Sequence, residues 1–332
     1  MKQRVIITEW VHPEVITELE EVCEVVPNTT REALSREEVI RRAKNAQAIM
    51  AFMTDYIDDE FLSACPRLKI IAAALKGYDN FDVEACSKRG IWLTIVPDML
   101  TVPTAELAIG LLISLSRNVL QGDRFVRSGA FKGWRPALYG MGLAGRTAGI
   151  IGMGMIGKEL ARRLVPFNLK RVMYHDRVLL PRVLEEHCGL SRASLEELLS
   201  TSDFVLPLLP LTPTTKHLIG RDAIARMMRG SYLVNVSRGS IVDEQAVAEA
   251  LADGHLAGYA ADVFEFEDWA RPDRPREIAS TLLKDELHSL FTPHLGSAVE
   301  TARKEIEMQA AMSILQYFSG KMPSGAVNKP LI

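Results

Sequence analysis

Short apolar runs alternate with amphipathic segments along the first hundred residues. Residues 13–22 and 35–46 have the spacing of helices, and Ser35 with Glu38 forms a capping box at the start of the second. Strands that alternate with helices usually form a parallel sheet covered on both faces. This part of the chain is therefore predicted to be an α/β unit, with strands expected near residues 4–8, 24–26, 48–52, 68–74 and 91–95.

The next fifty residues have a different pattern. Residues 101–117 are helical in spacing and apolar nearly all round, so we expect a helix that is buried on most sides, at a domain or subunit boundary. Residues 121–145 are rich in glycine and aromatic residues and lack a clear period. They are predicted to form a loop region over the surface.

A second βα series begins at Thr147 and ends before a last helix at 299–320. Its pattern predicts a doubly wound nucleotide-binding domain. The expected strands are 148–153, 171–176, 204–210, 231–236, 258–263 and 289–294, and the expected helices are 155–164, 194–203, 221–227 and 243–254.

Composition narrows the class of protein. A length of 332 residues suggests about two domains, and a formal net charge of -3 gives no general attraction to nucleic acid or to an anionic membrane. No apolar run approaches the ~20 residues of a membrane span, and the charged N-terminus does not resemble a signal peptide. We therefore expect a cytoplasmic protein. The four cysteines lack metal-ligand spacing, which predicts buried thiols, no disulfide and no metal site.

A glycine-rich segment carries the first chemical signal. Gly152, Gly154 and Gly157 fit G-x-G-x-x-G between an apolar strand and an amphipathic helix, and Asp176 follows at the end of the next strand. Glycines permit a tight turn and a close approach of the backbone to a pyrophosphate, and the N–H groups of the helix N-terminus, at Met155 and Ile156, bind phosphate. The segment predicts a dinucleotide site.

The residues after the second strand bear on which dinucleotide binds. Asp176 can accept hydrogen bonds from the adenosine ribose, which favours NAD. Arg177 could instead pair with the 2′-phosphate of NADP, which Asp176 would repel. We expect NAD as the cofactor, with NADP also accepted.

Three polar residues follow successive strands of the second series. Arg238, Glu267 and His294 stand where the carboxyl ends of parallel strands form a ligand crevice. An arginine can clamp an anion, a histidine can act as general base, and a glutamate can orient the imidazole. Each alone is more often a surface residue. Because the three residues follow the glycine segment in this order along the chain, they together predict a nicotinamide-dependent dehydrogenase that acts on a small anion.

A further cation stands in the first series. Lys76 follows the apolar run IIAAAL and precedes Gly77, which allows a close backbone approach to an anion. An ordinary surface lysine is the alternative.

The segments GMGMIG, LPLTPTT, VNVSRGSIVDE, AADVFEFE and TPHLGS resemble the D-2-hydroxyacid dehydrogenases. The longer segments ALKGYDNFDVEAC, FVRSGAFKGWRPALYGMGL and YAADVFEFEDWARPDRPR resemble the phosphite-oxidising branch of that family, the phosphonate dehydrogenases, over essentially the whole chain. The pair Asp176–Arg177 departs from the Glu-Ala known in that branch. The departure puts strict NAD preference in doubt.

The resemblance implies NAD-dependent oxidation of phosphite to phosphate by a homodimer. It implies a smaller, flavodoxin-like substrate domain from residues 1–99 and 300–332, and a Rossmann cofactor domain from residues 100–299. Arg238, Glu267 and His294 match the family's catalytic residues. The substrate-binding set implied is Lys76, Gly77, Met53, Trp134, Tyr139, Ser297 and Arg303, and the cofactor set is Thr104, Gly152, Gly154, Met155, Ile156, Gly157, Asp176, Arg177, Pro210, Ser237, Asp262 and His294.

Two alternatives remain open. The first is a dehydrogenase or reductase for a carbon 2-hydroxyacid such as glycerate, glyoxylate or lactate, which would use the same Arg, Glu and His. Charge favours phosphite over this alternative. Phosphite is a dianion near neutral pH, and the three cations Lys76, Arg238 and Arg303 match two negative charges better than the single charge of a carboxylate. The second is a non-enzymatic protein that senses NAD with this fold.

Overall fold

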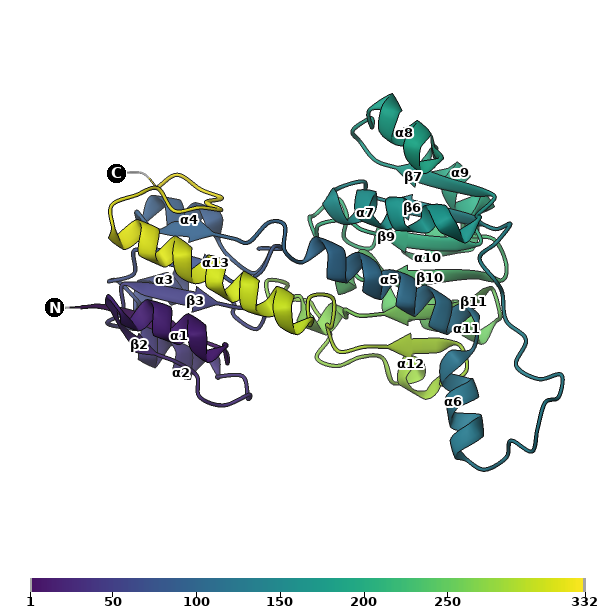
Figure 1. Ribbon diagram of the computed structural model, residues 1–332, viewed down its shortest axis with the longest axis horizontal. Coiled ribbons are helices and arrows are strands. Elements are labelled where there is room, and N and C mark those ends of the chain that lie inside the picture. Colours follow the sequence, from purple (N-terminus) through teal and green to yellow (C-terminus); the bar gives the residue numbers. More distant parts are fainter. Residues whose placement is uncertain (1, 331–332) are drawn as a thin grey trace. The chain divides into compact units, whose positions relative to one another are not determined.

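The computed structural model describes residues 2–330, and the chain divides into two compact units (Figure 1). The first unit comprises the residues up to Leu100, Trp269–Pro272, and the residues from Ala298 onward. The second comprises Thr101–Asp268 and Asp273–Ser297. The short segment Trp269–Pro272 belongs to the first unit, although the sequence-based boundaries placed it in the cofactor domain.

The first unit is built on a five-stranded parallel sheet in the order β2-β1-β3-β4-β5. This order is that of flavodoxin-like sheets, as predicted. The strands are β1 (Gln3–Ile7), β2 (Cys23–Val26), β3 (Ala48–Ala51), β4 (Ile70–Ala73) and β5 (Trp92–Thr94), and the helices are α1 (Pro13–Glu20), α2 (Arg36–Ala43), α3 (Asp59–Ala64), α4 (Val83–Lys88) and α13 (Glu300–Phe318).

Alternate residues of these strands face two apolar cores because side chains along a strand point to opposite faces. Val5 and Ile7 pack with Ile306 and Ala310 of α13, and Ile6 packs on the opposite face with Phe61 of α3. The sheet is therefore covered on both sides. The predicted cap is present at α2, where Ser35 Oγ accepts from the N–H of Glu38 at 3.3 Å.

The second unit contains a seven-stranded parallel sheet in the order β12-β11-β10-β9-β6-β7-β8. The order reverses at β6, which has β9 on one side and β7 on the other. A reversal of this kind opens a crevice at the carboxyl ends of the strands, and it identifies a Rossmann-type sheet. The predicted fold class is confirmed. The strands are β6 (Thr147–Ile151), β7 (Arg171–His175), β8 (Leu190–Arg192), β9 (Phe204–Pro207), β10 (Ser231–Asn235), β11 (Leu256–Ala261) and β12 (Ser289–Phe291).

Helices cover both faces of this sheet (Figure 1). Ile150 and Tyr174 lie in a core with Leu112 of α5, whereas Met173 and Tyr259 lie in the core on the other face. The helices are α5 (Thr101–Ser116), α6 (Val119–Arg127), α7 (Met155–Leu164), α8 (Arg182–Cys188), α9 (Leu195–Thr201), α10 (Arg221–Arg226), α11 (Glu244–Ala252) and α12 (Ser280–Lys284), with short 3-10 turns η1 (Val165–Phe167), η2 (Gly239–Ile241) and η3 (Glu265–Glu267).

One expectation for this unit is wrong in part. The first residues of the predicted loop region 121–145 belong to helix α6. The apolar residues of α6 recur with helical spacing. Arg127 Nε also donates to the carboxylate of Asp123, one turn earlier, at 2.8 Å, and such an i,i+4 pair stabilises a helix. The irregular segment starts only after α6.

The cysteines are buried, free thiols, as predicted. Among residues 2–330, no helix is long and apolar enough to cross a membrane.

Candidate active site

The glycine segment joins β6 to α7 in the second unit. Gly152 has a φ of 99°, and a Cβ on it would lie 2.4 Å from the carbonyl oxygen of Leu208. A Cβ on Gly157 would lie 2.3 Å from the oxygen of Gly152, so α7 packs directly against the turn. The space beside Gly154, at the N-cap of α7, is open. A close-packed turn with open space at a helix N-terminus fits a dinucleotide pyrophosphate.

Asp176 follows β7 and lies beside this turn. Its Oδ2 accepts from the N–H of Met153 at 2.6 Å, and its Oδ1 accepts from the N–H of Val178 at 2.8 Å. Burial raises the pKa of Asp176, but these two hydrogen bonds and the nearby Arg177 together lower it by more. The net pKa is therefore below the ordinary value. The carboxylate is thus fixed and ionised, which suits an acceptor for ribose hydroxyls.

Arg238, Glu267 and His294 follow β10, β11 and β12, which are neighbours in the sheet. All three therefore lie at the same carboxyl edge. His294 Nδ1 is 2.8 Å from Oε2 of Glu267, whose Oε1 accepts from the N–H of Phe264 at 2.8 Å. Both side chains are about one-quarter exposed. The carboxylate fixes the orientation of the imidazole, and it leaves the opposite ring nitrogen, Nε2, for proton transfer.

The turn that carries Arg238 is organised by a buried amide. Asn235 Oδ1 accepts from the N–H and the hydroxyl of Ser237, at 3.1 and 2.8 Å, and its Nδ2 donates to the carbonyl of Arg238 at 2.9 Å. The Arg238 side chain bends over this turn, with Nη1 donating to the carbonyl of Ser237 at 2.9 Å. Ser237 thus lies at the predicted cofactor edge.

The loop that carries His294 is held by Asp262. The carboxylate of Asp262 is 1% exposed, and it accepts from Thr292 Oγ1 at 2.6 Å and from the N–H groups of Leu295 and Gly296 at 2.7 and 2.8 Å. Burial raises the pKa of Asp262, although these donors oppose the shift. Thr104 Oγ1 donates to the carbonyl of Gly296 at 3.2 Å. Asp262 and Thr104, predicted as cofactor contacts, position the His294 loop in this structure.

The two cations predicted for the first unit both lie near the carboxyl end of β4. Arg303 Nη1 donates to the carbonyl of Ala74 at 3.4 Å, two residues before Lys76. Burial lowers the pKa of Lys76, although Asp98 nearby opposes the shift. Burial also lowers the pKa of Arg303, and partly desolvated cations of this kind are suited to binding an anion.

The other predicted residues are more scattered. Met53 is half-buried after β3, and its carbonyl accepts from Asn80 Nδ2 at 3.1 Å. Gly77 and Ser297 are half-buried, whereas Pro210 is exposed. Trp134 and Tyr139 are 87% and 80% exposed on the segment after α6, so their place in a substrate pocket stays a prediction.

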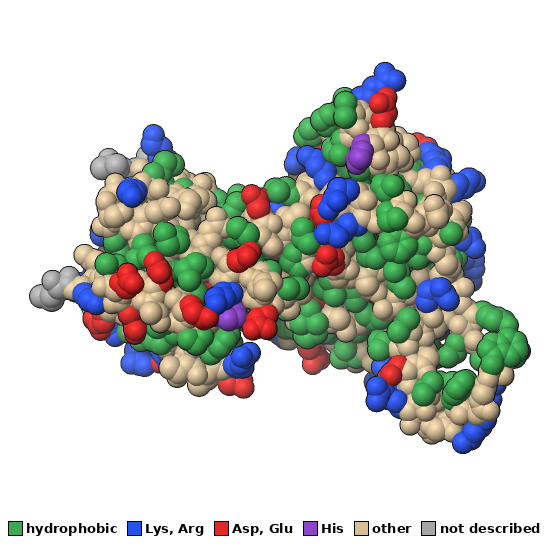
Figure 2. All heavy atoms as spheres, viewed as in Figure 1, with side chains coloured by type: hydrophobic (Ala, Val, Ile, Leu, Met, Phe, Trp, Pro, Cys, Tyr) green, Lys and Arg blue, Asp and Glu red, His purple; other side chains and the backbone are tan. Residues whose placement is uncertain are grey.

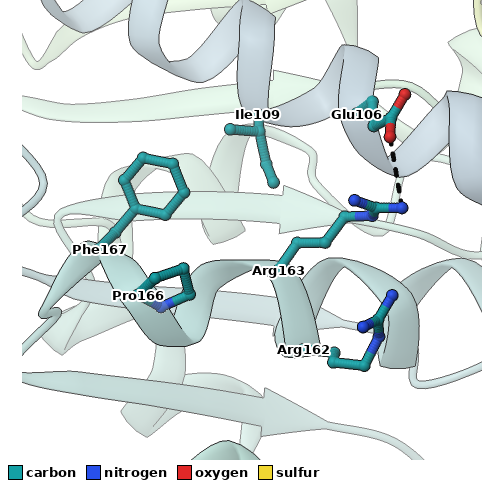
Figure 3. Close-up of a pocket in the computed structure, with 6 residues that line it drawn as sticks. All are labelled: Glu106, Ile109, Arg162, Arg163, Pro166 and Phe167. Carbon is teal, nitrogen blue, oxygen red and sulfur yellow. Dashed lines mark ion pairs between the residues drawn. The ribbon is translucent and has the colours of Figure 1, made fainter.

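A hollow of about 420 Å³ lies beside α7, away from the glycine turn. Figure 3 shows the residues that line it. It lies at the C-terminal end of that helix, whereas the glycine turn is at its start. Its cations are already paired, since Arg163 contacts Glu106 at 3.3 Å and both Arg162 and Arg163 contact Glu159. This hollow therefore offers no unneutralised cation for an anionic ligand.

Sequence reasoning missed two residues beside the proposed site. Arg192 on β8 donates from Nη2 to the backbone carbonyl of Asp176 at 3.3 Å. Glu307 on α13 is buried beside Arg303. Glu307 could have been predicted from its i,i+4 spacing to Arg303. No local pattern in the sequence indicates Arg192.

Known proteins resemble this chain over its full length. Residues 109–296 match the family described as D-isomer specific 2-hydroxyacid dehydrogenase, NAD binding domain. A glyoxylate reductase of Korarchaeum cryptofilum is 38% identical over 334 residues, covering 100% of this chain and 98% of the relative. These matches agree with the family resemblance, whereas the relatives' names do not repeat the finer resemblance to phosphonate dehydrogenases.

Two solved structures are similar as well. D-lactate dehydrogenase from Aquifex aeolicus, complexed with NAD and lactic acid, has a TM-score of 0.86 at 25% identity and covers 99% of this chain and 100% of that one. The NADPH-dependent glyoxylate/hydroxypyruvate reductase of Sinorhizobium meliloti, in complex with NADP and malonate, has a TM-score of 0.83 at 27% identity and covers 100% of both chains. The chain therefore belongs to the D-isomer specific 2-hydroxyacid dehydrogenase family of oxidoreductases, and its second unit is the NAD-binding domain.

Proposed function

We propose that this protein is a dehydrogenase that oxidises phosphite to phosphate with NAD, and that it also accepts NADP. The observation that carries the dehydrogenase assignment is the hydrogen-bonded pair His294–Glu267 at the same sheet edge as Arg238, in an NAD-binding domain. A base, its orienting carboxylate and an anion clamp are the groups that hydride transfer from an anionic donor requires.

Each residue has a distinct role in this proposal. Arg238 binds the phosphite oxygens and orients the P–H bond. His294 removes a proton from the water that attacks phosphorus, and Glu267 stabilises the imidazolium that forms. Bound NAD supplies the hydride acceptor, C4 of the nicotinamide. Phosphite, water and NAD⁺ thus give phosphate, NADH and a proton. Orientation and charge stabilisation supply much of the acceleration.

Charge supports phosphite as the substrate. The first unit presents Lys76 and Arg303 near one strand end, and phosphite near neutral pH carries two negative charges. The long segments that resemble phosphonate dehydrogenases include the exposed one with Trp134 and Tyr139. They are the second support for phosphite.

Reduction of glyoxylate or a related 2-oxoacid is the second candidate, and the named relatives favour it over phosphite. It uses the same Arg238, Glu267 and His294, with His294 donating a proton instead of removing one. Enzymes on one fold differ in substrate through a few side chains, so 38% identity to a glyoxylate reductase leaves both candidates open.

One assay separates these candidates. The purified protein is mixed with NAD and phosphite, and NADH is followed together with phosphate release. In parallel, NADH is mixed with glyoxylate, hydroxypyruvate or pyruvate. NADH formation that is stoichiometric with phosphate is the expected result. Turnover of the 2-oxoacids alone would overturn the phosphite assignment, and NAD binding with no turnover would favour a sensor. His294→Ala is the matched control, because it should abolish whichever reaction occurs.

We also propose a homodimer. Apolar side chains gather on α6 and the segment after it, at the lower right of Figure 2, and include Phe131, Trp134 and Tyr139. Monomeric proteins rarely expose large apolar patches. Light scattering should give twice the mass of one chain. A monomer at micromolar concentration would exclude the dimer.

A further inference from the structure

Glu307 is a buried carboxylate that the proposed mechanism does not use. It lies on α13 in the first unit and is 3% exposed. Its Oε2 accepts from the backbone N–H of His12 at 3.0 Å and is 2.7 Å from the ring Nδ1 of the same residue. Its Oε1 is 3.7 Å from Nη2 of Arg303, one turn earlier on the helix. The carboxylate thus joins a histidine on one side to an arginine on the other.

Arg303 is fixed at the carboxyl edge of the sheet. Its guanidinium carbon is 5.6 Å from the centre of the Phe52 ring, and Nη1 donates to the carbonyl of Ala74. Phe52 and Ala74 are the first residues after β3 and β4. The guanidinium therefore reaches the ends of two adjacent strands, where ligands bind in open α/β sheets.

Because Glu307 is buried, its negative charge must be compensated by neighbouring groups. A buried carboxylate is stable only when hydrogen bonds and cations compensate it, and a partly buried guanidinium needs an anion for the same reason. The two bonds from His12 occupy Oε2, which fixes the carboxylate rotamer and leaves Oε1 facing Arg303. Loss of the negative charge would free Arg303 to turn toward water.

We propose that Glu307, held by His12, is a positioning residue that keeps Arg303 directed at the anionic substrate. This proposal rests on the proposed function, in which Arg303 contacts the substrate. A purely structural role, in which Glu307 only ties α13 to α1, is the competing explanation.

A double-mutant cycle in the full-length protein separates the two roles. Glu307→Gln keeps the shape and removes the charge. It should raise the KM for the substrate roughly 10-fold, because it removes the anion of the 3.7 Å ion pair with Arg303, while the KM for NAD stays within about 2-fold. In an Arg303→Ala background the same change should have an effect below about 3-fold, because the two residues act as a unit. Equal losses in both backgrounds would show that Glu307 does not act through Arg303.

Two matched variants show whether a change in kinetics arises from loss of the fold. Glu305→Gln changes an exposed glutamate on the same helix and should leave kinetics and melting temperature unchanged. Glu307→Asp keeps the charge and should restore part of the substrate affinity. If Glu307→Gln does not fold, the cycle is run with Glu307→Asp, whose smaller KM effect should likewise vanish in the Arg303→Ala background.

Crystal structures of the wild type and Glu307→Gln test the positioning without any assay. The guanidinium of Arg303 should leave the Ala74 carbonyl in the variant. An unmoved Arg303 would overturn the inference even if phosphite is the substrate. If only glyoxylate is turned over, the phosphite assignment fails, and the cycle is measured with glyoxylate instead.

Discussion

At the scale of single residues, Asp262 is the buried carboxylate that holds the loop of His294, with hydrogen bonds on both sides of that histidine. Asp262→Asn should lower kcat/KM roughly 10-fold and destabilise the second unit by about 1–3 kcal/mol, because an amide nitrogen would face backbone N–H donors. Steady-state kinetics and urea unfolding measure both effects. Asp222→Asn, an exposed change on α10, is the control. Loss of cofactor affinity with unchanged stability would instead support a cofactor contact.

Glu244 gives the second unit a pH-dependent stability. Burial, helped by the nearby carboxylates of Glu265 and Asp268, raises the pKa of Glu244 to about 7, against the opposing hydrogen bond from the N–H of Glu265. The folded state therefore keeps a proton that the unfolded chain loses above the ordinary glutamate pKa of 4.5. This contribution to stability is complete below that pH and disappears as the pH rises through about 7.

Glu244→Gln should remove this dependence. Its free energy of unfolding should fall less between pH 5 and 8 than that of the wild type, by roughly 3 kcal/mol at most. Urea unfolding at four pH values measures the difference. The exposed Glu196→Gln is the control and should follow the wild type. Parallel profiles for Glu244→Gln and wild type would contradict the expectation.

The chemistry of single residues could be predicted from the sequence better than their contacts. Arg238, Glu267 and His294 could be found because each residue type follows a strand, and strand ends of a parallel sheet meet. Asp262 was predicted as a cofactor contact, yet its hydrogen-bond partners lie about thirty residues away in the chain. No local pattern encodes such a pairing, since the fold alone brings the two segments together.

At the scale of elements, long buried segments were predicted well and short exposed ones poorly. α5 and α7 appeared within a residue or so of their bounds because burial imposes a strong apolar period. β8 has three residues at the sheet edge, and α6 buries none of its side chains. Such elements leave little periodic signal, so the sequence did not reveal that Arg192 of β8 lies beside Asp176.

The position of β8 predicts which residues set cofactor preference. Arg192 and Arg177 flank Asp176, so both can pair with a 2′-phosphate. Arg192→Ala and Arg177→Ala should each lower kcat/KM for NADP roughly 10-fold while NAD stays within about 2-fold. Initial rates with both cofactors give the ratio, with the exposed Arg182→Ala of α8 as control. Equal losses for both cofactors would remove the discriminating role.

At the scale of the molecule, the sequence predicted two α/β units and their family, but the substrate is harder to infer. Strand ends and the glycine turn follow from the fold and from dinucleotide binding, so they identify the cofactor domain. In the proposed function, the choice of substrate depends on a few cations, such as Lys76 and Arg303, and on the exposed segment after α6. These groups have no period, and relatives can change them without changing the fold.

The discontinuity of the first unit has a consequence for how the protein is made. Its five strands leave the ribosome first, but α13, which covers the face lined by Val5 and Ile7, follows about 200 residues after Thr94. Helix α1 covers part of that apolar face through Val15 and Leu19, but the part under α13 stays exposed during synthesis while the second unit is translated and can fold. Exposed apolar surface and open strand edges promote aggregation. We expect the nascent first unit to be the part of this chain that depends most on chaperones, and to be the last to become resistant to protease.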